Sequence, residues 1–183
     1  MDWPYELGAP PETLARCFDI VVRQFEKPML RLLLGYSRRE AVAAELAQEV
    51  FVKAYQQIFR YDPTRPFSGW IFTIAANHAR DFLRRQQSHP QDSPLENTRD
   101  CPDAAFRTPD RQMESAELSV ALEAAITGLD PVYSEPLILR HSAGLDVREI
   151  GEVLGLSVDA VKTRLSRARR QLQMVLEKEW SPK

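Results

Sequence analysis

The C-terminal third of the chain contains polar side chains whose types and spacing suit contact with nucleic acid. Between Val158 and Arg170 the sequence is rich in Lys and Arg and has one acid, Asp159. Lys and Arg bind phosphates and guanine edges, while Ser and Thr hydroxyls bind either. At helical spacing the apolar residues of this segment share one face, and the opposite face is polar. The side chains of that polar face are Lys162, Thr163, Ser166, Arg167 and Arg170.

A second polar cluster lies in the first half of the chain. Asn77, Arg80, Asp81 and Arg84 follow one another at spacings that place them on one helix face, with Arg85 beside it. A neutral amide among arginines suits a base edge held next to phosphates. This face is therefore a second candidate for DNA contact.

Aromatic residues precede and begin that helix. Rings such as Phe59 and Tyr61 stack on unpaired bases at ~1–3 kcal/mol per base. We expect Phe67 to lie in the core and leave Phe59 open between core and surface. Trp70 lies beside the apolar stripe, which is compatible with a core role.

Composition favours a folded protein that works with partners. The chain has 183 residues, 44% of them hydrophobic, and a net charge of −2. Since phosphate contacts supply most non-specific affinity, this near-neutral charge predicts weak DNA binding by the chain alone and function within a larger machine. The sequence shows no secretion signal and no run long enough to span a membrane, so a cytoplasmic location is expected.

No constellation of residues points to catalysis. We find no phosphate-binding loop, nucleophile triad or carboxylate pair, and no histidine has a second ligand at metal spacing. We therefore expect no enzyme activity, no cofactor, no metal and no small-molecule substrate. His78 falls on an apolar stripe and is expected in the core. Cys17 and Cys101 are interpreted as a buried thiol and a loop thiol, with a redox switch as the alternative.

The spacing of apolar residues predicts an all-α fold with two small helical domains. In the first domain, residues 1–87, we expect a helix kinked or broken at Pro28, a helix over about 39–58, and a helix from Gly69 to about Gln86 with Ser68 as N-cap. Residues 88–112 are rich in Pro and acids and predict a flexible linker. The domains are expected to adopt different spacings.

The second domain, residues 113–183, is expected to end in a helix-turn-helix. A short helix is predicted around Glu135–His141, with Pro136 in its first turn. Asp146 and Glu149 have the spacing of a capping box, and Gly155 supplies a left-handed stop before a cap at Ser157. The second helix, from Val158, would enter the major groove.

These segments resemble the extracytoplasmic-function (ECF) RNA polymerase sigma factors, over about residues 12–87 and 113–176. Gly144–Leu172 resembles the fourth conserved region of that family. Glu45–Tyr55 resembles its core-binding motif, and Tyr61–Arg85 resembles its −10 recognition segment. The chain departs from the family pattern at Gly151, where Ala is usual, and at Pro136.

The resemblance implies an alternative sigma factor with defined partners: core RNA polymerase (through the clamp helices of the largest subunit and the flap), promoter DNA, and an anti-sigma factor that is often membrane-anchored and could sequester the chain at the membrane. It implies polymerase contacts at Glu45, Gln48, Glu49 and Lys53, although a plain solvated face is the alternative there. It implies −10 contacts at Phe59, Tyr61, Trp70, Asn77, Arg80, Arg84 and Arg85, with Asn77 and Tyr61 forming a pocket for an unpaired base. It implies −35 contacts at Lys162, Thr163, Ser166, Arg167 and Arg170.

Two other functions fit parts of the sequence. A free-standing helix-turn-helix regulator would bind duplex DNA tightly on its own. A sigma-like decoy that binds an anti-sigma factor would keep its function when Lys162 or Arg167 is changed to Ala.

Overall fold

The computed structural model describes residues 11–88 and 122–179, and these residues form helices and connecting turns without a strand. We call residues 11–88 the N-terminal half and residues 122–179 the C-terminal half. The linker predicted over 88–112 and the start of the second domain near Met113 lie outside the described residues, except for Ser88, which ends a helix. Within these two ranges no helix is both long and apolar enough to cross a membrane.

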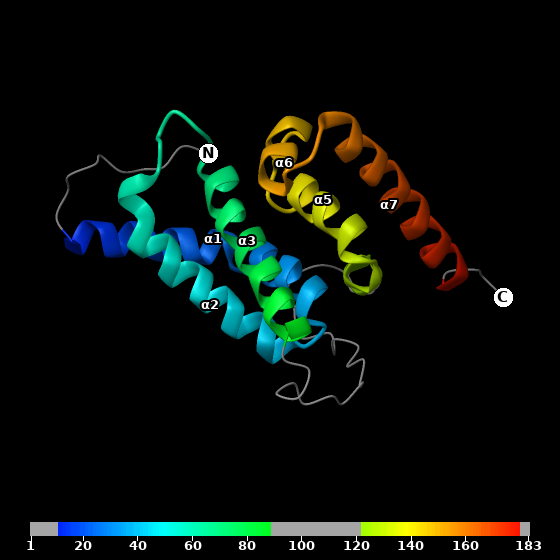
Figure 1. Ribbon diagram of the computed structural model, residues 1–183, viewed down its shortest axis with the longest axis horizontal. Coiled ribbons are helices and arrows are strands. Elements are labelled where there is room, and N and C mark those ends of the chain that lie inside the picture. The colour runs from blue at the N-terminus through cyan, green and yellow to red at the C-terminus, as the bar shows by residue number, and fades with distance from the viewer. Residues whose placement is uncertain (1–10, 89–121, 180–183) are drawn as a thin grey trace, which may run out of the picture.

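Three long helices build the N-terminal half (Figure 1): α1 (Pro11–Ser37), α2 (Glu40–Gln57) and α3 (Phe67–Ser88), with a short 3-10 turn η1 (Ile58–Arg60) after α2. They bury an apolar face against one another, with Met29, Val50 and Phe72 fully enclosed. Pro28 does not break α1, because the helix runs through that residue. Pro28 is itself buried, and the loss of one backbone donor is tolerated inside this packed helix.

The start of α3 also differs from the prediction. The helix begins at Phe67, and the Trp70 amide already donates to the Pro66 carbonyl at 3.4 Å. Ser68 is therefore inside the first turn and is not the N-cap. Phe67, the first residue of the helix, is 3% exposed and lies in the core.

The C-terminal half contains a helical segment over 122–128 followed by α5 (Pro131–His141), α6 (Val147–Leu154) and α7 (Val158–Glu179). Helix α5 starts four residues before the predicted Glu135, because Asp130 caps it by accepting from the Val132 amide and Pro131 occupies its first turn. Pro136 lies inside the helix. The helix-turn-helix of α6 and α7 is confirmed.

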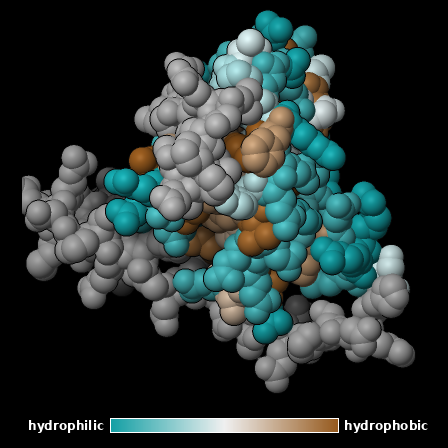
Figure 2. Space-filling model, turned by 90° about the vertical axis from the view of Figure 1, so that its left-hand side faces the viewer, coloured by the Kyte–Doolittle hydropathy of each residue, from teal (hydrophilic) through white to brown (hydrophobic). Residues whose placement is uncertain are grey.

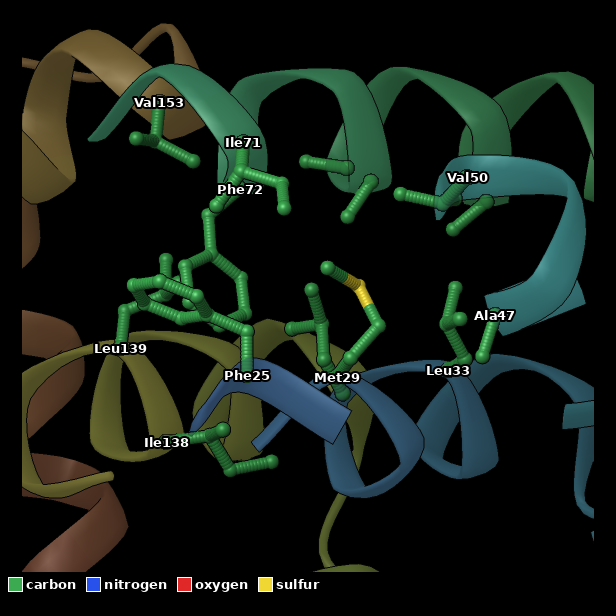
Figure 3. Packing of buried hydrophobic residues seen from close by; sticks show 14 of the residues in the cluster. Phe25, Met29, Leu33, Ala47, Val50, Ile71, Phe72, Ile138, Leu139 and Val153 are labelled. Atoms are coloured by element: carbon green, nitrogen blue, oxygen red, sulfur yellow. The ribbon is translucent and has the colours of Figure 1, made fainter. Parts of the chain in front are cut away.

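The two halves are packed together. Helix α5 lies against α1, and α6 lies against α3. Buried side chains of both halves form one continuous hydrophobic cluster. Figure 3 shows Ile138 and Leu139 of α5 beside Phe25 of α1, and Val153 of α6 beside Ile71 of α3. The sequence predicted the halves but not this contact.

Candidate nucleic-acid interface

Local hydrogen bonds cap the starts of both α6 and α7. Asp146 accepts from the amides of Arg148 and Glu149, and the Glu149 carboxylate accepts from the Asp146 amide at 2.6 Å. Gly155 adopts φ 67°, a left-handed conformation that favours glycine. Ser157 then accepts from the Ala160 amide at 3.2 Å. The predicted caps and stop are confirmed, and they fix the direction in which α7 leaves the turn.

Helix α7 presents its polar face to solvent. Val161, Leu165 and Ala168 are buried against the rest of the C-terminal half. Near the start of the helix, Lys162 pairs with Asp159 at 3.6 Å. Val158, the first residue of the helix, is 40% exposed. The five exposed candidates for DNA contact are Lys162, Thr163, Ser166, Arg167 and Arg170.

A buried carboxyl group lies beneath this helix and was not recognised from the sequence. Glu135 of α5 is 7% exposed, and burial raises its pKa to about 7, although Arg164 of α7 acts in the opposite direction. The uncharged form of Glu135 therefore predominates only below about pH 7. Glu135 lies four residues before the buried Leu139, on the same face of the helix, and this spacing could have predicted that its side chain points inward.

The polar face of α3 is assembled as predicted, but one member is partly covered. Asn77 is exposed, and its Oδ1 accepts from Arg80 Nη1 at 2.9 Å. Arg80 Nη2 donates to the Val153 carbonyl of α6 at 3.4 Å. Partial burial lowers the pKa of the Arg80 guanidinium. Arg80 therefore bridges the candidate base-contact residue and the C-terminal half.

The remaining basic residues of α3 are open to solvent. Arg84 forms an ion pair with Asp81 at 3.4 Å, and Arg85 donates from Nε to the Asp81 carbonyl at 3.4 Å. Exposed contacts of this kind are weak. Both guanidinium groups can therefore leave Asp81 and bind a phosphate.

Of the aromatic rings in and around the loop before α3, one is exposed and the others pack together. Phe59 is 75% exposed. Tyr61, expected to face a base, is 5% exposed; its ring packs edge-on against Phe67, and its hydroxyl donates to the Arg65 carbonyl at 2.6 Å. Trp70 is half-buried against both rings. In this arrangement Tyr61 supports the loop, and Phe59 is the accessible ring. The expected core position of Phe67 is confirmed.

The candidate polymerase face on α2 is tied to α3 through a buried histidine. Glu45, Gln48 and Glu49 are exposed, whereas Lys53 is half-buried. His78 Nδ1 lies 2.6 Å from Lys53 Nζ, and its Nε2 lies 2.8 Å from Glu49 Oε2, a close electrostatic contact rather than an aligned hydrogen bond. Burial, reinforced by Lys53, lowers the pKa of His78. A neutral ring with its proton on Nε2 fits both neighbours.

Apolar side chains are exposed near the same face. Val52 is 55% exposed, and Tyr55 is 39% exposed one turn later. Figure 2, viewed toward the end of the molecule where α1 begins and α2 ends, shows hydrophobic patches within a largely hydrophilic surface. Exposed apolar residues beside charged ones are typical of protein–protein contact surfaces. In the described ranges no group of His, Cys, Asp and Glu is arranged to hold a metal ion.

The fold and these surfaces define a helical DNA-binding protein in which a helix-turn-helix follows a three-helix unit with its own polar face. Residues 21–89 match the family model for sigma-70 region 2, and residues 119–172 match that for sigma-70 region 4. The chain belongs to the ECF RNA polymerase sigma factors, a family of transcription initiation factors.

Individual relatives agree with this assignment. The chain is 30% identical to the ECF sigma factor SigE of Mycolicibacterium smegmatis over 88% of its own length and 62% of that relative, so it spans less than two thirds of SigE. It is 30% identical to the sigma factor CnrH of Cupriavidus metallidurans, over 88% of this chain and 87% of CnrH. The solved structure of CnrH with the cytosolic domain of CnrY matches 90% of each chain, with 28% identity and a TM-score of 0.59.

Proposed function

We propose that this chain is an alternative sigma factor that binds core RNA polymerase and directs transcription from promoters with −35 and −10 elements. The observation that carries this proposal is the presence, in order in one chain, of matches to region 2 and region 4. A free-standing regulator would need the helix-turn-helix alone and gives no reason for the N-terminal match.

Each surface has a separate role in the proposal. The α2 residues Glu45, Gln48, Glu49 and Lys53 contact the polymerase clamp helices, where charge complementarity promotes specific association. The α3 residues Asn77, Arg80, Arg84 and Arg85 contact the −10 element, and Phe59, Tyr61 and Trp70 supply the aromatic rings for its unpaired bases. The polar face of α7 enters the −35 major groove.

The chain supplies binding energy rather than a chemical step. Strand opening follows from trapping unpaired bases at the −10 element, and no residue is assigned a catalytic role. We place the chain in the cytoplasm, with residues 1–87 and 113–183 as its two domains and 88–112 as linker. Because a solved relative is held by the anti-sigma domain CnrY, we also propose control by an anti-sigma factor.

Run-off transcription with purified core polymerase on fragments of the source genome tests this function. We expect discrete transcripts only when the chain is present. Each good base contact is worth ~1–3 kcal/mol, so Asn77→Ala or Arg167→Ala should lower their yield about tenfold or more. Arg23→Ala, an exposed arginine of α1, is the matched control and should leave the transcripts unchanged. Absence of transcripts together with tight binding of the isolated chain to duplex DNA would favour the regulator.

A further inference from the structure

The buried ring of His78 contacts the candidate polymerase face from inside the protein. Helices α2 and α3 pack against each other (Figure 1), and His78 of α3 is 3% exposed. Its Nδ1 lies 2.6 Å from Nζ of Lys53, and its Nε2 lies 2.8 Å from Oε2 of Glu49. Both neighbours belong to the α2 residues that are proposed to contact core polymerase. Each ring nitrogen of His78 therefore meets a side chain of that surface.

These two contacts require a neutral ring in one tautomer. The ammonium group of Lys53 can only donate, so Nδ1 of His78 must accept and the ring proton must lie on Nε2. That proton faces the Glu49 carboxylate, which can only accept. An apolar side chain would fill the same space without burying polar atoms that need partners. Packing alone therefore does not account for a histidine here.

Both neighbours keep the capacity to bind a partner protein. The Glu49 side chain is 56% exposed, and its carboxylate has further lone pairs for a cation. Lys53 has three ammonium hydrogens, of which His78 takes one. Long side chains lose rotamer freedom when they bind, so holding them in place beforehand lowers the cost of association.

From these contacts we infer that His78 is a positioning residue for core polymerase binding: from α3, its neutral imidazole holds Lys53 and Glu49 of α2 in the geometry that meets the polymerase. The inference rests on the proposed function and deepens it, since it adds a buried residue of α3 to the surface that α2 presents. His78 acts only through its two neighbours, because its own ring is enclosed.

The same contacts make this surface sensitive to acid. In the part of the chain that the structure describes, the charged groups acting on the ring are Lys53 and Glu49 of α2 and Arg85 of α3. Burial and then Lys53 lower the pKa of His78 from its ordinary 6.5, whereas Glu49 acts in the opposite direction. Protonation removes the acceptor for Lys53 and places two cations side by side. Core binding should therefore be complete above pH 6.5 and weaken as the pH falls through the lowered pKa.

A double-mutant cycle separates positioning from packing. The affinity of the full chain for purified core polymerase is measured for His78→Leu in the natural chain and in a Glu49→Gln/Lys53→Met background. We expect His78→Leu to weaken binding about tenfold in the natural chain, because two side chains lose their preorganisation. It should have little effect in the background that lacks both charges, whereas a residue that serves packing alone would weaken binding by the same factor in both. Ile71→Val trims a fully buried side chain of the same helix and is the control that should leave the affinity unchanged.

The pH profile of core binding is a second readout and decides the matter if circular dichroism shows that His78→Leu does not fold. His78→Asn retains an acceptor for Lys53 but does not titrate. We expect the ratio of wild-type to His78→Asn affinity to fall several-fold as the pH decreases below 6.5. Titration of the polymerase itself cancels in this ratio. Nuclear magnetic resonance of the imidazole nitrogens in the isolated chain should place the proton on Nε2 at neutral pH.

Three results would overturn the inference. They are an equal effect of His78→Leu in both backgrounds, an affinity ratio that does not change with pH, and a ring that carries its proton on Nδ1 at neutral pH. If the wild-type chain does not bind core polymerase at any pH, the proposed function itself fails. The magnetic resonance measurement still tests the contacts with Lys53 and Glu49 in that case.

Discussion

Gly151 in the middle of α6 combines a weak local preference for helix with a strong packing requirement. From the sequence, Gly in place of the usual Ala lowers helix propensity by up to ~1 kcal/mol. In the structure, a Cβ at this position would lie 2.7 Å from the Leu156 carbonyl oxygen. The Leu156 amide also donates to the Gly151 carbonyl at 2.8 Å, closing the turn. Gly therefore permits the close approach of α6 and the turn.

Gly151→Ala is expected to destabilise the protein despite the gain in helix propensity. The clash involves backbone, which cannot move without disturbing the helix-turn-helix, and overpacking of this kind costs about 1–3 kcal/mol. This exceeds the ~1 kcal/mol favouring Ala. Urea denaturation followed by circular dichroism measures the difference, with Gly128→Ala as control because a Cβ there meets nothing. An increase in stability for Gly151→Ala would show that the turn relaxes.

The exposure of single residues in the candidate site was predicted best where helical spacing determines which way a side chain points. The exposed residues of α7 and Asn77 follow from periodicity alone. Tyr61 lies in a loop, where no periodicity applies, and its ring joined Phe67 in the core. His78 of α3 contacts Lys53 and Glu49 of α2. Because the contact joins two helices, it cannot be predicted from the sequence of either helix alone.

At the scale of elements, local capping signals predicted the helix-turn-helix well. Asp146, Gly155 and Ser157 act on neighbours within a few residues, and such interactions depend little on the rest of the fold. The same logic identifies Asp130 and Pro131 as the start of α5, a signal that was available but passed over. Helix α1 continues through Pro28 because tertiary packing outweighs the local cost.

The packing of α5 against α7 predicts a pH-dependent stability centred on Glu135. Its folded pKa of about 7 lies above the ordinary 4.5, so the folded state binds more protons than the unfolded state between these values. Stability from this group therefore falls as pH rises from 4.5 to 7 and then stays low. Glu135→Gln removes this penalty.

We expect Glu135→Gln to stabilise the protein by up to about 3 kcal/mol above pH 7, with the gain shrinking toward zero near pH 4.5. Urea denaturation of both proteins across this pH range measures it. Glu152→Gln, an exposed carboxylate of α6, is the matched control. A constant difference at all pH values would show that Glu135 does not titrate in this range.

At the scale of the whole molecule, the sequence predicted two helical halves but not their contact. Arg31, Arg38 and Arg80 donate hydrogen bonds to the C-terminal half. Arg31 and Arg80 lie in helices and Arg38 in the turn after α1, and a solvated role is the ordinary interpretation of such arginines. Their partners are 73 to 111 residues away. No local pattern encodes a contact over that separation. The apolar residues at the contact between the halves are equally consistent with two separate cores.

A continuous core should make the two halves unfold together. The buried hydrophobic cluster includes residues of α1, α3, α5 and α6, so losing one half exposes apolar surface of the other. We expect differential scanning calorimetry of the wild-type chain to give one transition, with equal calorimetric and van't Hoff enthalpies. Arg31→Ala/Arg38→Ala should weaken this coupling and broaden or split the transition, while Arg23→Ala should not. Two separate transitions in the wild-type chain would mean that the halves are energetically independent.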